Sequence, residues 1–203
     1  MTGDSLNEVN EAVRKNGRLR WIHVRHEETG AYAAAAEAQL TGELACCAGS
    51  SGPGHVHLIN GLYDAQRSGA RVLAIASTIP SREFGTEYFQ ETNTIKLFDD
   101  CSYYNQVATT PEQFPRMLQG AHASGDLITW GRGDRDVPGD LAAENATAGL
   151  SSTFSFPTRQ RVCPAEQEIR ELADLLNNAK KVTLYCGIGA KDAIRNWCSW
   201  LNY

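Results

Sequence analysis

Two short apolar runs without polar alternation constrain the fold of this chain most strongly. They are Glu43–Gly49 (ELACCAG) and Arg71–Ser77 (RVLAIAS), and a turn with a helical pattern at Ser50–Gly69 lies between them. A strand that is apolar on both faces is typical of a parallel sheet covered by helices on both sides. Strands that alternate with helices in this way predict an α/β fold, a parallel sheet flanked by helices with right-handed crossovers.

The composition suits a folded chain and excludes several kinds of partner. Of the 203 residues, 42% are apolar and 21% are charged, which is enough apolar material for a packed core. The formal net charge is −5 and no basic stripe occurs, so we expect no nucleic acid partner. No signal peptide opens the sequence and no apolar run could span a bilayer, which predicts a cytoplasmic protein without membrane association.

The cysteine spacing gives no sign of a metal centre. The chain has six cysteines, none of them in a C-x-x-C pair. Cys46 and Cys47 are adjacent inside an apolar run, where a thiol usually acts as a small hydrophobic group. The spacing therefore predicts neither a metal site nor a disulfide.

The first part of the chain alternates between helical and strand patterns. The alanine-rich segment Glu27–Leu40 is strongly helical, with Gly30 its one weak residue, and Arg18–Val24 has a strand pattern. Further expected elements are helices at Leu6–Lys15, Thr92–Phe98 and Pro111–His122 and a strand at Ser102–Val107.

A change of composition predicts a domain boundary. Residues 131–160 are rich in Gly, Asp, Ala and Ser and show few apolar periods, which is typical of a connection. Beyond it, Pro164–Leu176 predicts an amphipathic helix, and Lys180–Ala193 predicts a strand, a glycine turn and a helix start. We therefore expect a first α/β domain over 1–130, a linker over 131–160, and the incomplete beginning of a second α/β domain over 161–203.

Two glycine turns are candidate ligand contacts. Gly49, Gly52 and Gly54 lie between a strand and a helix, where glycine permits positive φ and helix N–H groups are free to bind a polar group. The turn matches neither Walker A nor G-x-G-x-x-G, so a plain tight turn is equally consistent with it. Cys186–Ala190 (CGIGA) is similar, and it leaves open a plain nucleotide-binding domain that takes NAD or FAD.

One carboxylate is placed where open α/β sheets bind ligands. His26, Glu27 and Glu28 begin a helix directly after the strand pattern, at the expected carboxyl edge of the sheet. A zinc protease motif is excluded, because Gly30 stands where H-E-x-x-H needs its second histidine. Acidic residues also favour a first helical turn because of the helix dipole, so both a functional and a structural role for Glu27 stay open.

Several motifs together resemble one enzyme family. The segment Val24–Ala65 (VRHEETGAYAAAAEAQLTGELACCAGSSGPGHVHLINGLYDA) resembles the pyrimidine-binding domain of thiamine-diphosphate enzymes, most closely the branch of pyruvate oxidase and quinone-dependent pyruvate dehydrogenase. The resemblance spans Thr2–Gln119. It includes the motifs TGDSLN (2–7), VLAIASTIPS (72–81) and YFQETN (88–93), and it returns at Val137–Ala142 and from Pro164 to Ala193. That last stretch resembles the start of the family's middle domain, which holds FAD in the oxidases.

The resemblance implies roles for individual residues. Glu27 would be the catalytic carboxylate that shares a proton with N1′ of the aminopyrimidine and favours the 4′-imino tautomer, which prepares the cofactor to decarboxylate a 2-keto acid. Gly52, Pro53 and Gly54 would pack against the cofactor rings. Phe89 and Gln90 would lie on the substrate side, near the reacting carbon. His26 would either help to orient the site or be an ordinary structural histidine.

Three departures from the family pattern imply that this chain supplies half a site. The helix and first strand that usually precede the opening motif are missing, and polar residues 126–136 replace an expected apolar strand. The diphosphate domain, whose Gly-Asp-Gly motif and downstream Asn hold Mg²⁺, has no counterpart, so no metal ligand is expected here. We expect a truncated member with little activity alone, paired across the dimer interface with a second copy or a full-length homologue.

The sequence leaves three functional alternatives open. The first is a thiamine-diphosphate half-site of an enzyme that decarboxylates pyruvate or another 2-keto acid, with acetolactate synthase-like chemistry as a variant. The second is a non-catalytic remnant that associates with full-length subunits of the family. The third is the plain nucleotide-binding domain.

Overall fold

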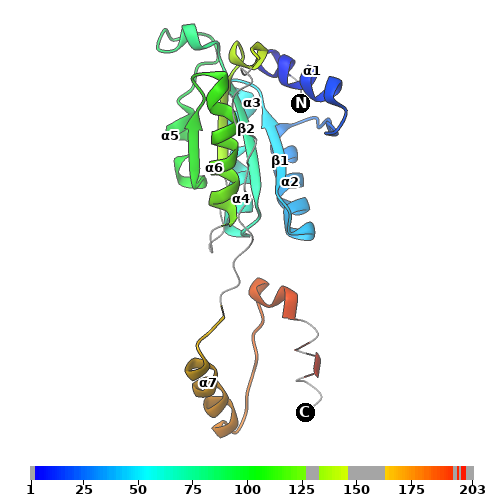
Figure 1. Ribbon diagram of the computed structural model, residues 1–203, viewed down its shortest axis with the longest axis vertical. Coiled ribbons are helices and arrows are strands. Elements are labelled where there is room, and N and C mark those ends of the chain that lie inside the picture. The colour runs from blue at the N-terminus through cyan, green and yellow to red at the C-terminus, as the bar shows by residue number, and fades with distance from the viewer. Residues whose placement is uncertain (1–2, 127–132, 146–162, 194–195, 197, 200–203) are drawn as a thin grey trace. The chain divides into compact units, whose positions relative to one another are not determined.

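The computed structural model describes residues 3–126, 133–145 and 163–193, together with 196, 198 and 199 (Figure 1). The chain divides into two compact units, Met1–Gln160 and Arg161–Tyr203. Within the described residues, no helix is both long enough and apolar enough to cross a bilayer.

A parallel sheet forms the centre of the first unit. Its described strands lie in the order β1-β2-β4-β3, and every neighbouring pair is parallel. The strands are β1 (Ala45–Gly49), β2 (Val72–Thr78), β3 (Tyr104–Val107) and β4 (Gly133–Pro138). The expected α/β class with a parallel sheet is therefore confirmed.

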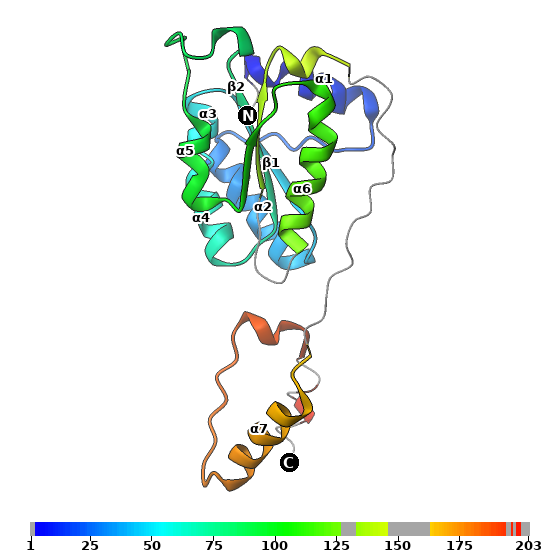
Figure 2. The same ribbon diagram turned by 60° about the vertical axis from the view of Figure 1, so that its left-hand side comes forward.

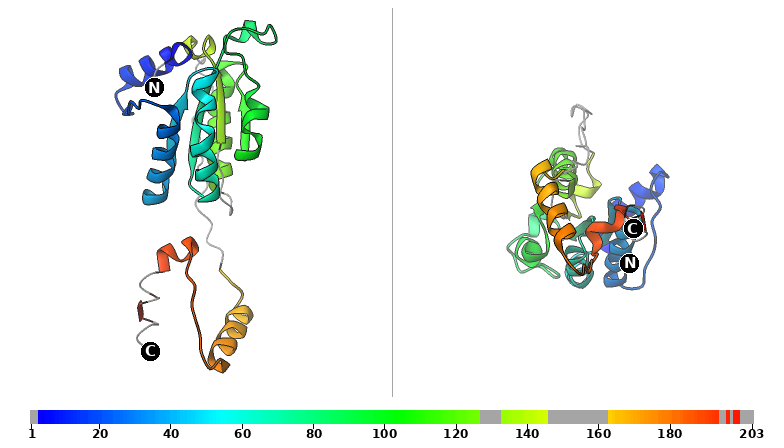
Figure 3. Two further views of the ribbon diagram at one scale, coloured as in Figure 1. Left: turned by 180° about the vertical axis from the view of Figure 1, so that it is seen from behind. Right: turned by 90° about the horizontal axis from the view of Figure 1, so that it is seen from below.

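Helices cover both faces of this sheet. Figures 2 and 3 show α2 and α4 on one face and α6 on the opposite face. The helices of the first unit are α1 (Asn7–Asn16), α2 (Glu27–Thr41), α3 (Pro53–Val56), α4 (Ile59–Arg67), α5 (Thr94–Phe98) and α6 (Phe114–Asp126). Short 3₁₀ turns occur at Asp4–Leu6, Ser81–Glu83, Asp99–Cys101, Pro111–Gln113 and Leu141–Ala143. The two-sided cover explains why β2 is apolar along nearly its whole length.

Small residues let α2 lie close to its neighbours. The helix buries four alanines, Ala31, Ala34, Ala35 and Ala38, which belong to the same core cluster as Leu58, Leu62 and Phe98. Gly61 on α4 faces Ala31 so closely that a Cβ on Gly61 would lie 2.5 Å from the Ala31 Cβ. The alanine-rich sequence thus serves close helix-on-helix and helix-on-sheet packing.

The strand expected at Arg18–Val24 is wrong. These residues are irregular, and Leu19 and Ile22 are 69% and 63% exposed. An alternating pattern forms a strand only where another strand pairs with it, and no described strand lies alongside these residues.

Part of the segment expected to be a linker belongs to the sheet. Within 131–160, residues Gly133–Pro138 form β4, which pairs with β2 on one side and β3 on the other. Backbone hydrogen bonds to two neighbours hold a strand without requiring an apolar side-chain pattern, so the polar sequence did not reveal it. Residues 146–160 lie outside the described residues.

The second unit contains α7 (Glu166–Asn178) and a 3₁₀ turn at Ile188–Ala193. The helix begins close to the expected position, after Pro164, and Ile169, Leu172 and Leu175 on it are more than half exposed. Residues 182–187 form no strand, because the described part of this unit offers them no partner strand. The assignment of this unit as the beginning of a middle domain stays a prediction.

Candidate functional site

The turn after β1 requires glycine at three positions. A Cβ on Gly49 would lie 2.7 Å from the His55 Cα, so the chain can double back here only without a side chain. Gly52 has φ +65° and ψ −122°, a conformation that residues with a side chain rarely adopt. Gly54 is buried, whereas Pro53 between the two glycines is exposed. The structure therefore brings Gly52 and Gly54, rather than Pro53, into a packed site.

Glu27 is a buried carboxylate with an unsatisfied oxygen. It is the first residue of α2 and only 1% exposed. Its Oε1 accepts no hydrogen bond from any group in the described part of the chain, and its Oε2 lies 3.4 Å from the His57 Nδ1. Burying a carboxylate oxygen without a donor is costly, so this oxygen is a candidate to bind a ligand, an ion or water.

The glycine turn lies close to this carboxylate. A Cβ on Gly54 would lie 3.3 Å from Oε1 of Glu27 and 2.5 Å from Oγ of Ser50. The absence of a side chain at Gly54 therefore lets the turn pack against Ser50 and lie close to Oε1. Glu27 and Gly54, which lie in two separate sequence motifs, are therefore neighbours in the folded chain.

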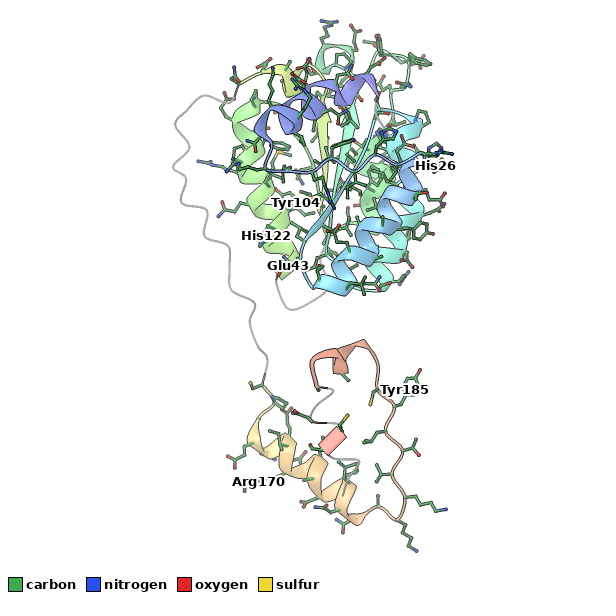
Figure 4. All side chains as sticks on the ribbon, turned by 90° about the vertical axis from the view of Figure 1, so that its right-hand side faces the viewer. His26, Glu43, Tyr104, His122, Arg170 and Tyr185 are labelled. Carbon is green, nitrogen blue, oxygen red and sulfur yellow. The ribbon has the colours of Figure 1, made fainter. Side chains whose placement is uncertain are left out.

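Two histidines border Glu27. The rings of His26 and His57 stack with centroids 4.3 Å apart and planes inclined by 28°. His26 precedes α2, lies at the surface (Figure 4), and has its Nδ1 3.7 Å from Oε2 of Glu28. The sequence did not assign His57 to the site. The spacing could have indicated it, because His57 follows Gly54 by three residues and residues at this spacing lie on the same face of a helix.

Gln90 reaches the glycine turn and Phe89 does not. The Ser51 Oγ donates a hydrogen bond of 3.0 Å to the Gln90 Oε1, and the Gln90 side chain lies against Gly52. Gln90 also has φ +67°, which is uncommon for a residue with a side chain. Phe89 is 79% exposed. Of Phe89, Gln90 and His26, the three expected substrate-side residues, only Gln90 is in contact with the turn at Gly52.

His55 holds the turn to the rest of the domain. Its Nδ1 lies 2.9 Å from the carbonyl oxygen of Ser77, and its Nε2 lies 2.6 Å from Oγ1 of Thr92. Because a carbonyl only accepts, Nδ1 carries the proton and Nε2 accepts from the threonine hydroxyl. Burial lowers the pKa of His55, which keeps the ring neutral and fits this tautomer.

A cavity of about 620 Å³ lies near the ends of two strands. Its lining includes Thr78 from the end of β2, Val107 from the end of β3, and Phe84, Tyr88 and Thr92 from the intervening segment. Glu27 does not line it, so within the first unit the cavity and the carboxylate are separate features. Both lie near carboxyl ends of parallel strands, where open α/β sheets bind ligands.

The N-terminal part of the chain matches a known protein family. The family described as "Thiamine pyrophosphate enzyme, N-terminal TPP binding domain" matches residues 1–97. That range contains Glu27, both histidines beside it and the glycine turn.

Three similar proteins cover nearly the whole chain. An uncharacterized 42.6 kDa protein in the isoamylase 3′ region of Pseudomonas amyloderamosa is 48% identical over 194 residues, which are 95% of this chain and 49% of that protein. Pyruvate oxidase of Lactiplantibacillus plantarum is 35% identical over 94% of this chain and 32% of its own length. The chloroplastic acetolactate synthase of Arabidopsis thaliana is 29% identical over 92% of this chain and 28% of its own. The chain thus spans about half or less of the length of these relatives.

Proposed function

We propose that residues 1–97, which match the family of thiamine pyrophosphate enzymes in its N-terminal TPP binding domain, supply the aminopyrimidine side of a thiamine-diphosphate site. The enzyme that this site serves decarboxylates a 2-keto acid, with pyruvate as the first candidate. The observation that carries the proposal is the buried Oε1 of Glu27, which lacks a protein donor and lies beside Gly54.

The residues present fit an aminopyrimidine ring. A carboxylate oxygen that is buried and without a donor suits a ring nitrogen that shares a proton with it. Gly54 has no side chain, so none approaches Oε1 from the glycine turn.

Each residue of the site then has a defined task. Glu27 holds or releases a proton at Oε1, and its burial removes competing water from that oxygen. Gly52 and Gly54 keep the turn close to the ring, and Ser51 holds Gln90 next to Gly52 through its hydrogen bond. Thiamine diphosphate, when bound, supplies the electron sink for the loss of CO₂.

A complete thiamine-diphosphate enzyme also needs parts that do not belong to this site. The diphosphate and its Mg²⁺ would be held by a longer homologue that carries the diphosphate domain. The resemblance of the sequence to the family is the ground for proposing FAD as a further cofactor and working roles for Phe89 and His26. The sequence pattern is the ground for proposing a cytoplasmic location. The chain is similar to both pyruvate oxidase and acetolactate synthase, so the product formed after decarboxylation has to be identified by experiment.

The test is a thermal unfolding experiment on the purified full chain with thiamine diphosphate and Mg²⁺. A ligand that binds only the folded state stabilises it by about 2.7 kcal/mol at one hundred times its Kd. We expect the cofactor to raise the Tm of the wild type and of Glu37→Gln, an exposed position on the same helix, but not of Glu27→Gln. An equal rise in all three chains, or none in the wild type, would contradict the proposal.

A second measurement distinguishes catalysis from binding alone. Release of CO₂ from pyruvate is followed with the cofactor present, first for the chain alone and then with a full-length homologue added. Acetolactate as product would favour the synthase-like variant, and acetate or acetyl phosphate the oxidase-like one. Cofactor binding without turnover in either mixture would favour the non-catalytic remnant.

A further inference from the structure

His26, Glu27 and His57 bring three metal-ligating side chains together. One ligand atom from each lies within 4.8 Å of the others, and no second such group occurs among the described residues. The proposed function uses only the carboxylate of this group. The two imidazoles beside it are therefore free to contribute chemistry of their own.

The distances suit a small tetrahedral ion. The Glu27 Oε2 and the His57 Nδ1 are 3.4 Å apart. Zn²⁺ binds histidine nitrogen and carboxylate oxygen at about 2.0–2.2 Å, and two ligands of a tetrahedron at that bond length lie about 3.4 Å apart. This pair already has the spacing of one tetrahedral edge.

The third ligand has the freedom to complete the group. His26 stacks on His57, and its side chain is 48% exposed, so rotation of the ring meets little resistance. The His57 side chain is 42% exposed, whereas Glu27 is fixed by burial at 1%. A buried anchor with two adjustable surface imidazoles allows an ion to enter from solvent and draw the rings into place.

The charges favour a cation at this point. Glu27 contributes a carboxylate whose Oε2 lies 3.4 Å from the His57 Nδ1, and the carboxylate of Glu28 adds negative charge 3.7 Å from the His26 Nδ1. Neutral imidazoles with a carboxylate are the donor set of many zinc sites, whereas Mg²⁺ requires oxygen ligands in octahedral geometry.

We propose that His26, Glu27 and His57 form a binding site for Zn²⁺ or a similar borderline divalent cation, with the fourth coordination position open to solvent. The site shares Glu27 with the proposed function but does not depend on it. A chain that binds Zn²⁺ here and fails to bind thiamine diphosphate would support the metal site and contradict the proposed function.

The first test measures Zn²⁺ binding to the purified full chain by isothermal titration calorimetry with reduced thiols. We expect the affinity to fall at least about tenfold in His57→Gln and in His26→Gln, because loss of a direct ligand costs no less than loss of an outer partner. His23→Gln, an exposed histidine just before the group, is the matched control and keeps the wild-type affinity. Equal affinity in all four chains would overturn the proposal.

X-ray absorption at the zinc edge separates this site from the cysteines. Ligation by His26, Glu27 and His57 gives nitrogen and oxygen neighbours at about 2.0–2.2 Å, whereas thiolate ligands lie at about 2.3 Å. A first coordination sphere of nitrogen and oxygen in the one-to-one complex would support the proposal. A sphere dominated by sulfur would overturn it, whatever the calorimetry shows.

Discussion

Gly61 of α4 and Ala31 of α2 approach so closely that a Cβ on Gly61 would lie 2.5 Å from the Ala31 Cβ, and 2.7 Å from the Tyr32 backbone nitrogen. A methyl group at Gly61 would therefore force the two helices apart. We expect Gly61→Ala to lower the free energy of unfolding by about 1–3 kcal/mol, the usual cost of overpacking. Urea denaturation followed by circular dichroism measures this change.

A glycine on the partner helix provides the control. A Cβ on Gly30 of α2 would meet only the tip of Val24, at 3.3 Å, and alanine is the better helix former by about 1 kcal/mol. Gly30→Ala should therefore leave stability unchanged or raise it. If Gly61→Ala behaved in the same way, the close approach of α2 and α4 would be disproved.

Gly54→Ala should damage the cofactor site more than the fold. The new methyl group would crowd the Ser50 Oγ at 2.5 Å and would stand 3.3 Å from the Glu27 Oε1. We expect the affinity for thiamine diphosphate to drop at least about tenfold, which equals about 1.4 kcal/mol. In the double variant Ser50→Ala/Gly54→Ala the crowding at residue 50 is relieved. It should regain stability but not binding, and recovery of binding would contradict the assigned role of Gly54.

Glu27→Gln should make the unliganded chain more stable. A buried carboxylate oxygen without a donor is costly, and a neutral amide costs less to bury. We expect the free energy of unfolding without cofactor to rise by about 1 kcal/mol, as often happens when a functional site is neutralised. Glu37→Gln, exposed on the same helix, should show no change in urea denaturation. A loss of stability at Glu27 would show instead that the carboxylate is satisfied by the protein.

His55 should make stability depend on pH below neutrality. Burial lowers its pKa below the ordinary 6.5, so below pH 6.5 the unfolded chain takes up a proton that the folded chain does not. The contribution of His55 to the free energy of unfolding should be constant above pH 6.5. As the pH is lowered from 6.5, this contribution should decrease by up to about 1.4 kcal/mol per pH unit. The difference between wild type and His55→Gln from pH 5.5 to 8 isolates this contribution, and His23→Gln should follow the wild type. Parallel curves for wild type and His55→Gln would contradict the prediction.

Asp140 should stabilise the loop that follows β4. Its carboxylate accepts hydrogen bonds of 2.9 and 2.6 Å from the backbone N–H and the hydroxyl of Ser81. Partial burial acts to raise the pKa of Asp140, but hydrogen bonds from Ser81 and from the backbone N–H groups of Asp140 and Leu141 together outweigh it, and the pKa lies below 3.8. This stabilisation is present above pH 3.8 and disappears as the pH falls through the lowered pKa.

The matching variants are Asp140→Asn and Ser81→Ala. Asp140→Asn should cost about 1 kcal/mol at pH 7, and Ser81→Ala less, because the backbone N–H of residue 81 still donates. Both values come from urea denaturation at pH 7. A fully additive double variant would mean that the two side chains do not interact.

The sequence predicted the parts of the fold that depend on side-chain pattern. The apolar runs became β1 and β2, and the alanine-rich segment became α2, since burial on both faces leaves a clear signal. Glu27 could be singled out because a charged residue opens a helix at the expected sheet edge. Its isolation from protein donors is a property of the folded state and needed the structure.

Other features left no such signal. β4 is held by backbone pairing to two neighbours, so its polar residues 133–138 carried no strand pattern. The positive φ of Gln90 and the position of His57 beside Glu27 depend on segments far apart in the sequence. The prediction of a strand at Arg18–Val24 was wrong for the opposite reason, because these residues have the local pattern of a strand but no described strand pairs with them.

The strand order β1-β2-β4-β3 also determines how the sheet is completed during synthesis. β1 and β2 can pair with each other once β2 has emerged from the ribosome, but β3 has no neighbour in the described sheet until β4 follows it. Pairing across such long sequence separations is slow, because the intervening chain must close first. Until residues 133–138 arrive, one edge of the apolar strand β2 stays open, so a chain stalled or cut before them presents a template for pairing with another chain.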